Sequence, residues 1–440
     1  MPADWFHELA EFLRIESVSA DPSRGPEVRE AGEWVCDVVR QAGGDCELLD
    51  WNGQPLAVGE VRASRDADRA PTILCYGHFD VQPPDPLELW DSPPFQPEIR
   101  GDHLYARGVA DDKGQLYMLL AGARELAQAG ELPVNVRFAC DGEEETGGES
   151  IVEFVTADER RAQAAIIFDT GMIAPGRPAF DVATRGLTYF HLTLHTGARD
   201  LHSGMYGGAA LNAGHALIQT LGAVLPKDGR LAEPLRKGIV PPTQAERDGW
   251  TDLPLGADEL SDQGARPADP RAAEAFYLRT TSEPALDVNG FASGSAFAQK
   301  TVLPVRADAN VSMRLAPGQN PEEIAREFEE LLRGAVPAGA ELQIERLGFA
   351  PPAVFDPGSP AIQLGLRAFE RAVGTRPALV RSGGTLPIAA ALADRGIPTI
   401  ITGFSLPDSN IHSPNERLHA EYIPLGIAAA RALFEELAGL

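Results

Sequence analysis

Hydrophobic and polar positions follow a helical period in some stretches of the chain and form short, continuous apolar runs in others. Up to about residue 170, helical patterns alternate with apolar runs of the length and composition typical of buried strands. Strands separated by helices in this way predict a mostly parallel, doubly wound sheet. The predicted elements are an amphipathic helix leading into a polar loop over residues 1–25, helices over 31–44 and 113–130, and strands over 71–80, 134–140 and 164–169.

The middle of the chain has a different pattern. Residues 186–197 alternate between apolar and polar positions like a half-exposed strand, and residues 210–225 have helical spacing. Residues 305–336 predict a strand, a turn and a capped helix, and residues 340–348 predict a closing strand. The intervening residues 231–270 are rich in Pro, Gly and Asp and weakly periodic, which fits a long loop with short helices. The pattern predicts a small α+β unit.

The α/β pattern returns after about residue 352. A chain of 440 residues is long enough for two domains, because single cores rarely grow past about 250–300 residues. We therefore predict an α/β domain, with a doubly wound and mostly parallel sheet, formed by residues 1–184 and 352–440. A smaller α+β domain of residues 185–351 interrupts it. The last elements predicted are helices over 361–374 and 386–396, strands over 377–381 and 398–403, a Gly-rich turn over 382–385 and a final helix.

The composition argues against several classes of binding partner. The formal net charge of −26 argues against nucleic acid and anionic membrane surfaces, which both select a surplus of Lys and Arg. No run of about 18 apolar residues occurs, so we predict no membrane span. The first 25 residues lack the basic and apolar regions of a signal peptide. Four cysteines without CxxC spacing indicate reduced thiols and a cytoplasmic protein.

Acidic residues and histidines follow several predicted strands or occupy the turns beside them. Each cluster alone has an ordinary structural interpretation, such as a strand-end histidine, a solvated turn or an acidic helix start. Together they lie where a doubly wound sheet gathers its ligands, at the carboxyl ends of strands. Histidine with several carboxylates suits Zn²⁺, Mn²⁺ or Co²⁺, and the number of ligands predicts two ions that share a bridging carboxylate. The residues are His78, Asp80, Asp111, Asp112, Glu143, Glu144, Glu145, Asp169 and His412.

The motifs around these residues resemble those of the M20 family of dinuclear metallopeptidases, and particularly its dipeptidase branch, which includes carnosinase-like enzymes. The resemblance covers nearly the whole chain. It rests on the ordered motifs LRIESVSADP, YGHFDVQPPDPLELW, LYARGVADDKG, EEETGG, DLHSGMYGG, MRLAPGQ, RSGGTLP and HSPNE. Such a family implies a catalytic α/β domain interrupted by a lid and dimerisation domain.

The resemblance implies a role for each residue of the cluster. Glu144 would be the general base, taking a proton from a water held between the two ions and passing it to the leaving amine. Asp80 would orient the His78 imidazole, Asp112 would adjoin the bridging Asp111 across an unusual peptide bond, and Glu143 would be exposed and idle. The ions would be Zn²⁺, with Mn²⁺ or Co²⁺ as alternatives. Their ligands would be His78, Asp111, Glu145, Asp169 and His412.

The resemblance also implies functions in the middle unit. His202 would reach the active site of the partner subunit in a homodimer and stabilise the tetrahedral oxyanion, although its spacing alone indicates a loop histidine. Arg314 would bind the substrate carboxylate, with a strand-end surface arginine as the alternative. The turn formed by Ser382, Gly383, Gly384 and Thr385 would hold substrate or be merely a tight turn. It reads RSGGT, where many relatives have an acidic residue before the glycines.

We therefore predict a cytosolic dinuclear metallohydrolase that cleaves the amide bond of dipeptides or similar short substrates. One alternative is an N-acyl-amino-acid deacylase on the same scaffold. Another is a non-catalytic relative that binds metal or peptide, against which the presence of Glu144 argues, because a base has no use in binding alone. His191 and His195 share one face of a predicted strand and are expected to be structural.

Overall fold

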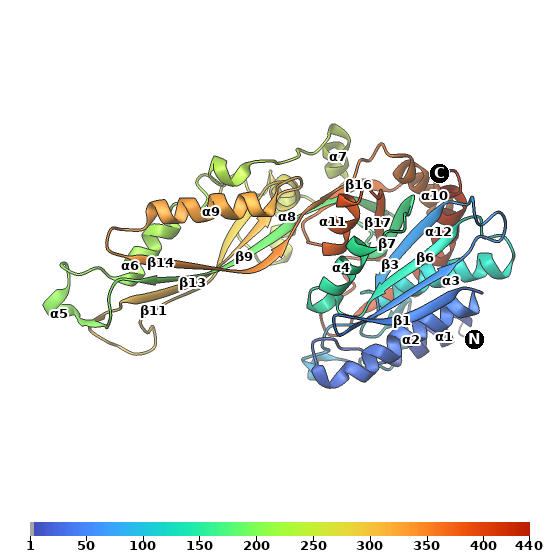
Figure 1. The fold of residues 1–440 in the computed structure, drawn as a ribbon, viewed down its shortest axis with the longest axis horizontal. Helices are drawn as coiled ribbons and strands as arrows, with labels where there is room; N and C mark the ends of the chain where they lie inside the picture. Colours follow the sequence, from blue (N-terminus) through green and yellow to red (C-terminus); the bar gives the residue numbers. More distant parts are fainter. Residues whose placement is uncertain (1–3) are drawn as a thin grey trace. The chain divides into compact units, whose positions relative to one another are not determined.

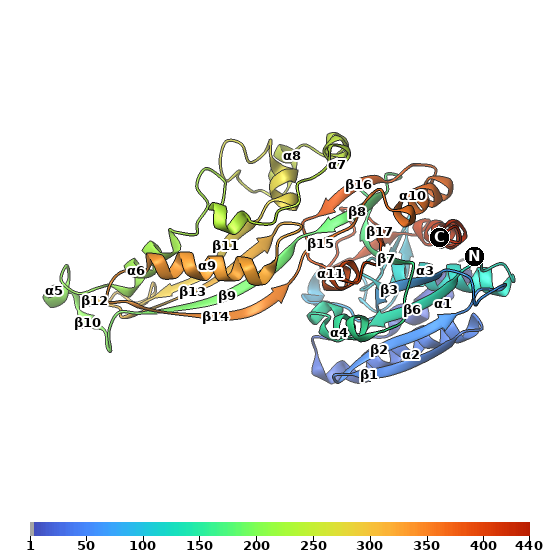
Figure 2. The ribbon, with the colours of Figure 1, turned by 45° about the horizontal axis from the view of Figure 1, so that its top comes forward.

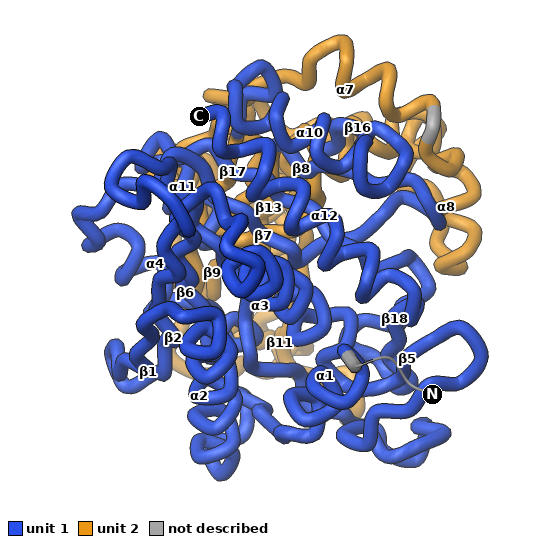
Figure 3. Tube along the Cα trace, turned by 90° about the vertical axis from the view of Figure 1, so that its right-hand side faces the viewer, with its two compact units in different colours: residues 1–182, 355–380, 387–440 blue, residues 183–354, 381–386 orange. Residues whose placement is uncertain are grey.

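The computed structural model describes residues 4–440, and their contacts divide the chain into two compact units (Figure 3). Unit 1 is formed by the chain up to Val182, by Phe355–Val380 and by Pro387–Leu440. Unit 2 is formed by Ala183–Val354 and Arg381–Leu386. The sequence predicts boundaries after residues 184 and 351, with the turn at 382–385 in the first domain.

Unit 1 contains a six-stranded sheet whose strand order is β1-β2-β6-β3-β7-β17 (Figure 1). The four strands from β6 to β17 are parallel to one another, whereas β2 is antiparallel to both of its neighbours. The predicted mostly parallel sheet is therefore confirmed. Its strands are β1 (Asp45–Trp51), β2 (Gln54–Val61), β3 (Thr72–His78), β6 (Asn135–Asp141), β7 (Ala164–Gly171) and β17 (Thr399–Ser405).

Helices cover both faces of this sheet, as expected for a doubly wound fold (Figures 1 and 2). In one layer, α1, α2 and α12 contact α3, and α10 contacts α12. The opposite layer is formed by α4 and α11, which contact each other. The first layer holds α1 (Asp4–Arg14), α2 (Gly25–Gln41), α3 (Lys113–Gln128), α10 (Pro360–Val373) and α12 (Tyr422–Leu437), and the second α4 (Glu149–Ala157) and α11 (Pro387–Asp394). Residues 1–3 of the predicted first segment lie outside the described residues.

The sequence analysis did not predict the hairpin of β1 and β2. These strands pair from Asp45↔Glu60 to Trp51↔Gln54, and the turn between them is Asn52-Gly53, with φ of 55° and 86°. Positive φ at both positions is the requirement of a type I′ turn, for which Asn-Gly is a preferred sequence. The dipeptide was therefore a usable signal for this hairpin.

Unit 1 also contains short strands and helices, and further short strands lie near the unit boundaries in the sequence. A small antiparallel sheet joins β4 (Glu98–Arg100), β5 (His103–Tyr105) and β18 (Arg417–His419). Strands β8 (Ala179–Thr184), β15 (Ala353–Val354) and β16 (Ala378–Ser382) lie at the unit boundaries in the sequence. The short helices are η1 (Pro22–Arg24), η2 (Leu87–Leu89) and η3 (Glu144–Thr146). Within residues 4–440, none of the helices combines the length and the apolar character needed to span a bilayer.

Unit 2 is built on a four-stranded antiparallel sheet of order β11-β13-β9-β14 (Figure 2). Two helices, α6 and α9, contact this sheet, and an apolar core containing Phe190, Val311 and Phe328 fills the space between them. The elements are β9 (Gly186–His195), β11 (Ala285–Ser293), β13 (Arg306–Leu315), β14 (Glu341–Ala350), α6 (Ala213–Leu221) and α9 (Pro321–Ala335).

The Pro/Gly/Asp-rich segment of unit 2 forms short helices joined by loops, as expected. The capping box of α7 shows why one helix begins there: Thr243 accepts the backbone N–H of Glu246, whose side chain accepts the N–H of Thr243. The short elements are β10 (Leu201–His202), α5 (Ser203–Tyr206), η4 (Glu233–Arg236), α7 (Gln244–Gly249), η5 (Trp250–Asp252), α8 (Gly256–Asp262), a π-helix at Leu278–Ser282, and β12 (Val302–Leu303).

Candidate functional site

His78 is the last residue of the buried central strand β3, and three carboxylates surround one of its ring nitrogens. Its Nε2 lies 3.0 Å from Asp111 Oδ1, 3.7 Å from Asp169 Oδ1 and 4.0 Å from Glu144 Oε2. Asp169 comes from β7, Glu144 from the loop after β6, and Asp111 from the loop before α3. These strand ends meet because the strands are parallel neighbours, as predicted for a doubly wound sheet.

The other ring nitrogen of His78 determines the tautomer. Nδ1 lies 3.1 Å from the backbone oxygen of Asp80 and 3.3 Å from its carboxylate Oδ1. Both atoms accept hydrogen bonds, so the proton of the neutral imidazole lies on Nδ1. The Nε2 lone pair then faces the carboxylates, which is the arrangement of a metal-binding histidine.

A second group of ligand atoms shares Asp111 with the first. His412, in the loop after β17, places Nε2 2.9 Å from Asp111 Oδ2 and 3.2 Å from Glu145 Oε2. Gln82, which the sequence analysis did not single out, donates from Nε2 to the same Glu145 oxygen over 2.9 Å. We call His78, Asp111 and Asp169 the first ligand group, and Asp111, Glu145 and His412 the second ligand group.

Two buried carboxylates hold the loop that carries the three adjacent glutamates. Asp80 accepts the backbone N–H of Glu144 over 3.2 Å and that of Glu145 over 3.1 Å. Asp141, at the end of β6, accepts the N–H of Glu143 over 3.0 Å. Since three consecutive N–H groups are bound in this way, the positions of the glutamates follow from the acids at the ends of β3 and β6.

The expectation that Glu143 is exposed and idle is wrong. Its side chain is half-buried, and Oε1 accepts the backbone N–H of Ser150 over 2.7 Å. Ser150 lies in the first turn of α4, where backbone N–H groups have no partner within the helix. Glu143 therefore caps α4, and its negative charge also suits that end of the helix.

The site attracts positive charge. Burial raises the pKa of Glu144 to about 8, and Asp169 and Glu145 contribute to the rise although His78 opposes it. Burial also raises the pKa of Asp169 to about 6, again against the effect of His78. Hydrogen bonds to Asp111 and Glu145 raise the pKa of His412 to about 10. Burial is the largest cause of the raised carboxylate pKa values, and the neighbouring acids add to it, whereas the same acids make the His412 imidazole strongly basic.

The two ligand groups fit divalent cations. Within each group, one ligand atom per residue lies within 4.8 Å of the others. Glu145 Oε1 is buried and has no hydrogen-bond partner within the described chain, which is costly for a carboxylate oxygen unless a cation is near. Imidazole nitrogen and carboxylate oxygen are donors that Zn²⁺, Mn²⁺ and Co²⁺ accept.

The Asp111 loop has the unusual peptide bond that the resemblance implied, since Asp111–Asp112 is cis. Asp112 is buried, and its Oδ2 accepts the backbone N–H of His78 over 3.1 Å. Lys113, also buried, donates to the backbone oxygens of Phe12 and Ile15. These bonds connect the loop to β3 and to the end of α1.

The residues assigned to substrate lie in unit 2. Arg314, in β13, donates from Nη1 to Thr385 Oγ1 over 2.8 Å, and Ser382 Oγ accepts the N–H of Gly384. Arg185, which the sequence analysis overlooked, donates from Nε to the oxygen of Gly383 over 3.0 Å. The structure thus brings Arg314 and the Ser382–Thr385 turn together, with Arg185 beside them.

The predicted histidines of unit 2 have separate environments. His202 is exposed at the end of β10, and its Nδ1 accepts the N–H of Gly204 over 3.0 Å. The neutral ring therefore carries its proton on Nε2. His191 Nδ1 lies 2.8 Å from Asn310 Oδ1 within the sheet. Neither His191 nor His195 joins a group of potential metal ligands among residues 4–440, and their structural role stays a prediction.

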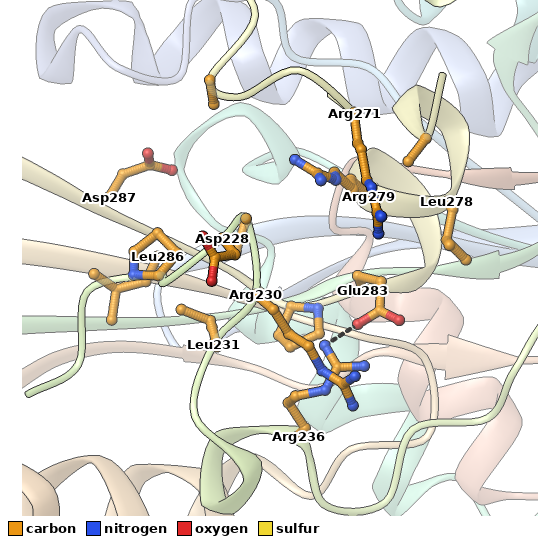
Figure 4. Close-up of a pocket in the computed structure, with 16 residues that line it drawn as sticks. Asp228, Arg230, Leu231, Arg236, Arg271, Leu278, Arg279, Glu283, Leu286 and Asp287 are labelled. Atoms are coloured by element: carbon orange, nitrogen blue, oxygen red, sulfur yellow. Dashed lines mark hydrogen bonds and ion pairs between the residues drawn. The ribbon is translucent and has the colours of Figure 1, made fainter. Parts of the chain in front are cut away.

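Unit 2 also contains a cavity of about 420 Å³. Figure 4 shows Arg236 paired with Glu283 at its wall. Arg279 binds Asp269 through both terminal nitrogens, with Nη2 3.1 Å from Oδ1. Because Glu283 and Asp269 already neutralise Arg236 and Arg279, we do not include this cavity in the candidate active site. The arginines that line it are Arg230, Arg236, Arg271 and Arg279.

Comparison with known proteins identifies the family. The chain is 28% identical to a cysteinylglycine-S-conjugate dipeptidase of Corynebacterium striatum, over 98% of this chain and 94% of that protein. It is 26% identical to the human beta-Ala-His dipeptidase, over 99% of this chain and 90% of that protein. The solved structure of an M20 family metallo-carboxypeptidase from Sulfolobus solfataricus superposes with a TM-score of 0.86 at 26% identity, covering 99% of this chain and all of that one. The pattern of Peptidase family M20/M25/M40 matches residues 74–436. The chain therefore belongs to this peptidase family, and the resemblance predicted from its motifs is confirmed.

Proposed function

We propose that this chain is a metal-dependent dipeptidase, with Glu144 as general base and two divalent ions, Zn²⁺ or alternatively Mn²⁺ or Co²⁺, in the two ligand groups. The observation that carries the proposal is the position of Glu144. Its Oε2 lies 4.0 Å from His78 Nε2, yet Glu144 belongs to neither ligand group. A carboxylate beside the ligands but outside both groups is free to exchange protons.

The bound ions, Glu144 and Asp80 would each have a separate role in amide hydrolysis. When bound, divalent ions act as Lewis acids that polarise a carbonyl and make water more acidic. Glu144 accepts the proton of the attacking water and delivers it to the nitrogen of the leaving amine. Burial raises the pKa of Glu144 to about 8 and bound cations would lower it, and a pKa near neutral lets a group both accept and return a proton. Asp80 fixes the base by accepting the Glu144 N–H.

Arg314 and Arg185 are assigned to the free carboxylate of the substrate. Arg314 uses one nitrogen for Thr385, and neither arginine has a carboxylate within ion-pair distance among the described residues. Burial and the neighbouring Arg314 lower the pKa of Arg185 to about 10. Asp287 only partly offsets this effect, so two adjacent guanidinium groups that form no ion pair within the described chain favour an anionic ligand, and a planar fork of donors suits a carboxylate.

We extend the proposal to a homodimer in which His202 acts on the active site of the partner subunit. The bond from Gly204 to His202 Nδ1 leaves the Nε2 proton available on an exposed ring. A neutral imidazole N–H can donate to a tetrahedral oxyanion, a contribution of about 3–4 kcal/mol in comparable sites. We also place the protein in the cytoplasm, which the four free cysteines support.

The test is hydrolysis of a panel of dipeptides, tripeptides and N-acetyl amino acids by chelator-stripped protein with Zn²⁺, Mn²⁺ or Co²⁺ added back. Glu144→Gln should lose dipeptide hydrolysis and still bind two ions. Its matched control is Glu143→Gln, because the adjacent side chain only caps α4 and its amide oxygen can still accept the Ser150 N–H. Equal activity of both variants would refute the role of Glu144.

The panel also separates the alternatives. Cleavage restricted to N-acetyl amino acids would assign the chain to the deacylases. Tripeptide cleavage from the carboxyl end would instead agree with its similarity to the Sulfolobus metallo-carboxypeptidase. Two bound ions without any hydrolysis would leave a binding protein and refute the proposal.

A further inference from the structure

Glu416 is a fully buried acid that holds the backbone of the Asp111 loop. It follows His412 by four residues, and its side chain has no exposed surface. Oε1 accepts the N–H of Ala110 over 2.8 Å and that of Asp111 over 3.2 Å, while Oε2 accepts the N–H of Gly108 over 2.9 Å. Its contacts therefore include the backbone amide of the ligand shared by both groups.

Arg107 forms an ion pair with the Glu416 carboxylate. Only 1% of its side chain is exposed, and Nη1 lies 2.7 Å from Glu416 Oε2. Nη2 donates to the backbone oxygen of Pro83 over 3.3 Å and to that of Ser413 over 3.4 Å. One guanidinium group thus connects the segment that follows Asp80 with the segment that follows His412.

We propose that the buried Arg107–Glu416 pair is a positioning device for the second ligand group. It fixes Asp111 through its backbone N–H and His412 through the chain between residues 412 and 416. Two of the three ligands in that group depend on the pair, whereas His78 and Asp169 in the first group make no hydrogen bond to it within the described chain. The inference rests on the proposed metal-dependent function, but its readout is ion binding.

A glutamine at position 416 cannot reproduce the arrangement. Its single oxygen can accept the amides of Ala110 and Asp111, but its NH₂ group would then face the N–H of Gly108 and the guanidinium of Arg107. Groups that orient metal ligands typically change ion affinity about 10–100-fold when they are replaced. The pair should therefore affect one ion more than the other, which an effect on folding alone would not do.

The experiment is calorimetric titration of stripped protein with Co²⁺, supported by visible absorption of the bound ion. Wild type should bind two ions, and Glu416→Gln should weaken one binding step about 10–100-fold while the other changes by less than about threefold. The weakened step should be the one that His412→Ala abolishes. Unchanged affinities, or equal weakening of both steps, in folded Glu416→Gln would overturn the proposal.

Two further variants keep the test decisive. Glu246→Gln disrupts a comparable buried pair in unit 2, where Glu246 Oε1 lies 2.5 Å from Arg381 Nε, and it should lower Tm without selective loss of either ion. If Glu416→Gln is recovered only unfolded, Arg107→Gln, which keeps the Glu416 carboxylate, is titrated instead. Selective weakening of one binding step would again support the proposal, and unchanged affinities or equal weakening of both steps would overturn it. A wild type that binds two ions but cleaves no peptide would refute the proposed function and leave this result interpretable.

Discussion

Asp80→Asn is expected to slow catalysis beyond any effect that it has on ion binding. Asp80 is completely buried, and its two oxygens accept the N–H groups of Glu144 and Glu145. Asparagine has one oxygen, so one of these N–H groups would face an NH₂ group. The His78 tautomer should survive, because Nδ1 lies closer to the Asp80 backbone oxygen, at 3.1 Å, than to the carboxylate, at 3.3 Å.

The magnitude follows from the bond that is lost. A hydrogen bond to a charged group contributes about 1.5–3 kcal/mol, and each 1.4 kcal/mol corresponds to about a tenfold change in rate. If the displaced Glu144 loop reaches its working position only at that cost, kcat should fall roughly 10- to 100-fold. The proposed function assigns substrate binding to Arg314 rather than to this loop, so KM should change less than about threefold.

The assay is steady-state hydrolysis of the best dipeptide together with Co²⁺ titration of the same protein. Asp141→Asn is the matched control, because Asp141 Oδ2 has no partner among the described residues and Oδ1 alone accepts the Glu143 N–H. Burial, together with Asp80, raises the pKa of Asp141 to about 8, which favours the neutral form that asparagine resembles. A kcat loss explained entirely by lost ions, or one equal in both variants, would refute the reasoning.

Three other outcomes are expected. Glu143→Ala should lower the free energy of unfolding by about 1 kcal/mol in urea titration, since α4 loses the acceptor for Ser150; an unchanged midpoint would contradict this. Burial raises the pKa of Glu246, but the bond to Arg381 outweighs it and holds the pKa below 4.5. The pair therefore stabilises the fold above about pH 4.5, and Glu246→Gln should cost about 3–5 kcal/mol at pH 7, a difference that shrinks as pH falls through the folded pKa; a constant difference from pH 7 to pH 3 would be inconsistent. Chelation should lower Tm, because ions at about 100 times Kd stabilise the fold by about 2.7 kcal/mol, and calorimetry with and without added Zn²⁺ measures it; an unchanged Tm would argue against bound ions.

The acids at the strand ends were predictable because of a general property of parallel sheets. Apolar runs locate β3, β6 and β7, and residues directly after parallel neighbours must meet at one edge. The position of Asp169 beside His78 follows from this rule alone. His412 lies far along the chain, but it also follows a strand of the same sheet.

Residues that act through backbone amides could not be found in this way. Glu416 binds the N–H groups of a segment more than 300 positions earlier in the chain, and no periodicity or spacing records such a bond. Glu143 and Glu144 are the same residue type at adjacent positions, so only the path of the loop separates a helix cap from the proposed base. The β1–β2 hairpin was missed for another reason, because the partly buried β2 lacks a clear alternation and the Asn-Gly turn was not used.

The division of unit 1 between both ends of the sequence sets the order in which the site is completed during synthesis. Chains are made from the N-terminus, and domains fold as units. The first ligand group emerges before Val182, whereas β17, His412 and Glu416 follow the whole of Ala183–Val354. The residues of the first ligand group are therefore all present while unit 2 is being translated, whereas the second ligand group lacks His412 until translation is almost finished. Under the proposed two-ion function, a prematurely terminated chain would lack the histidine of its second ligand group.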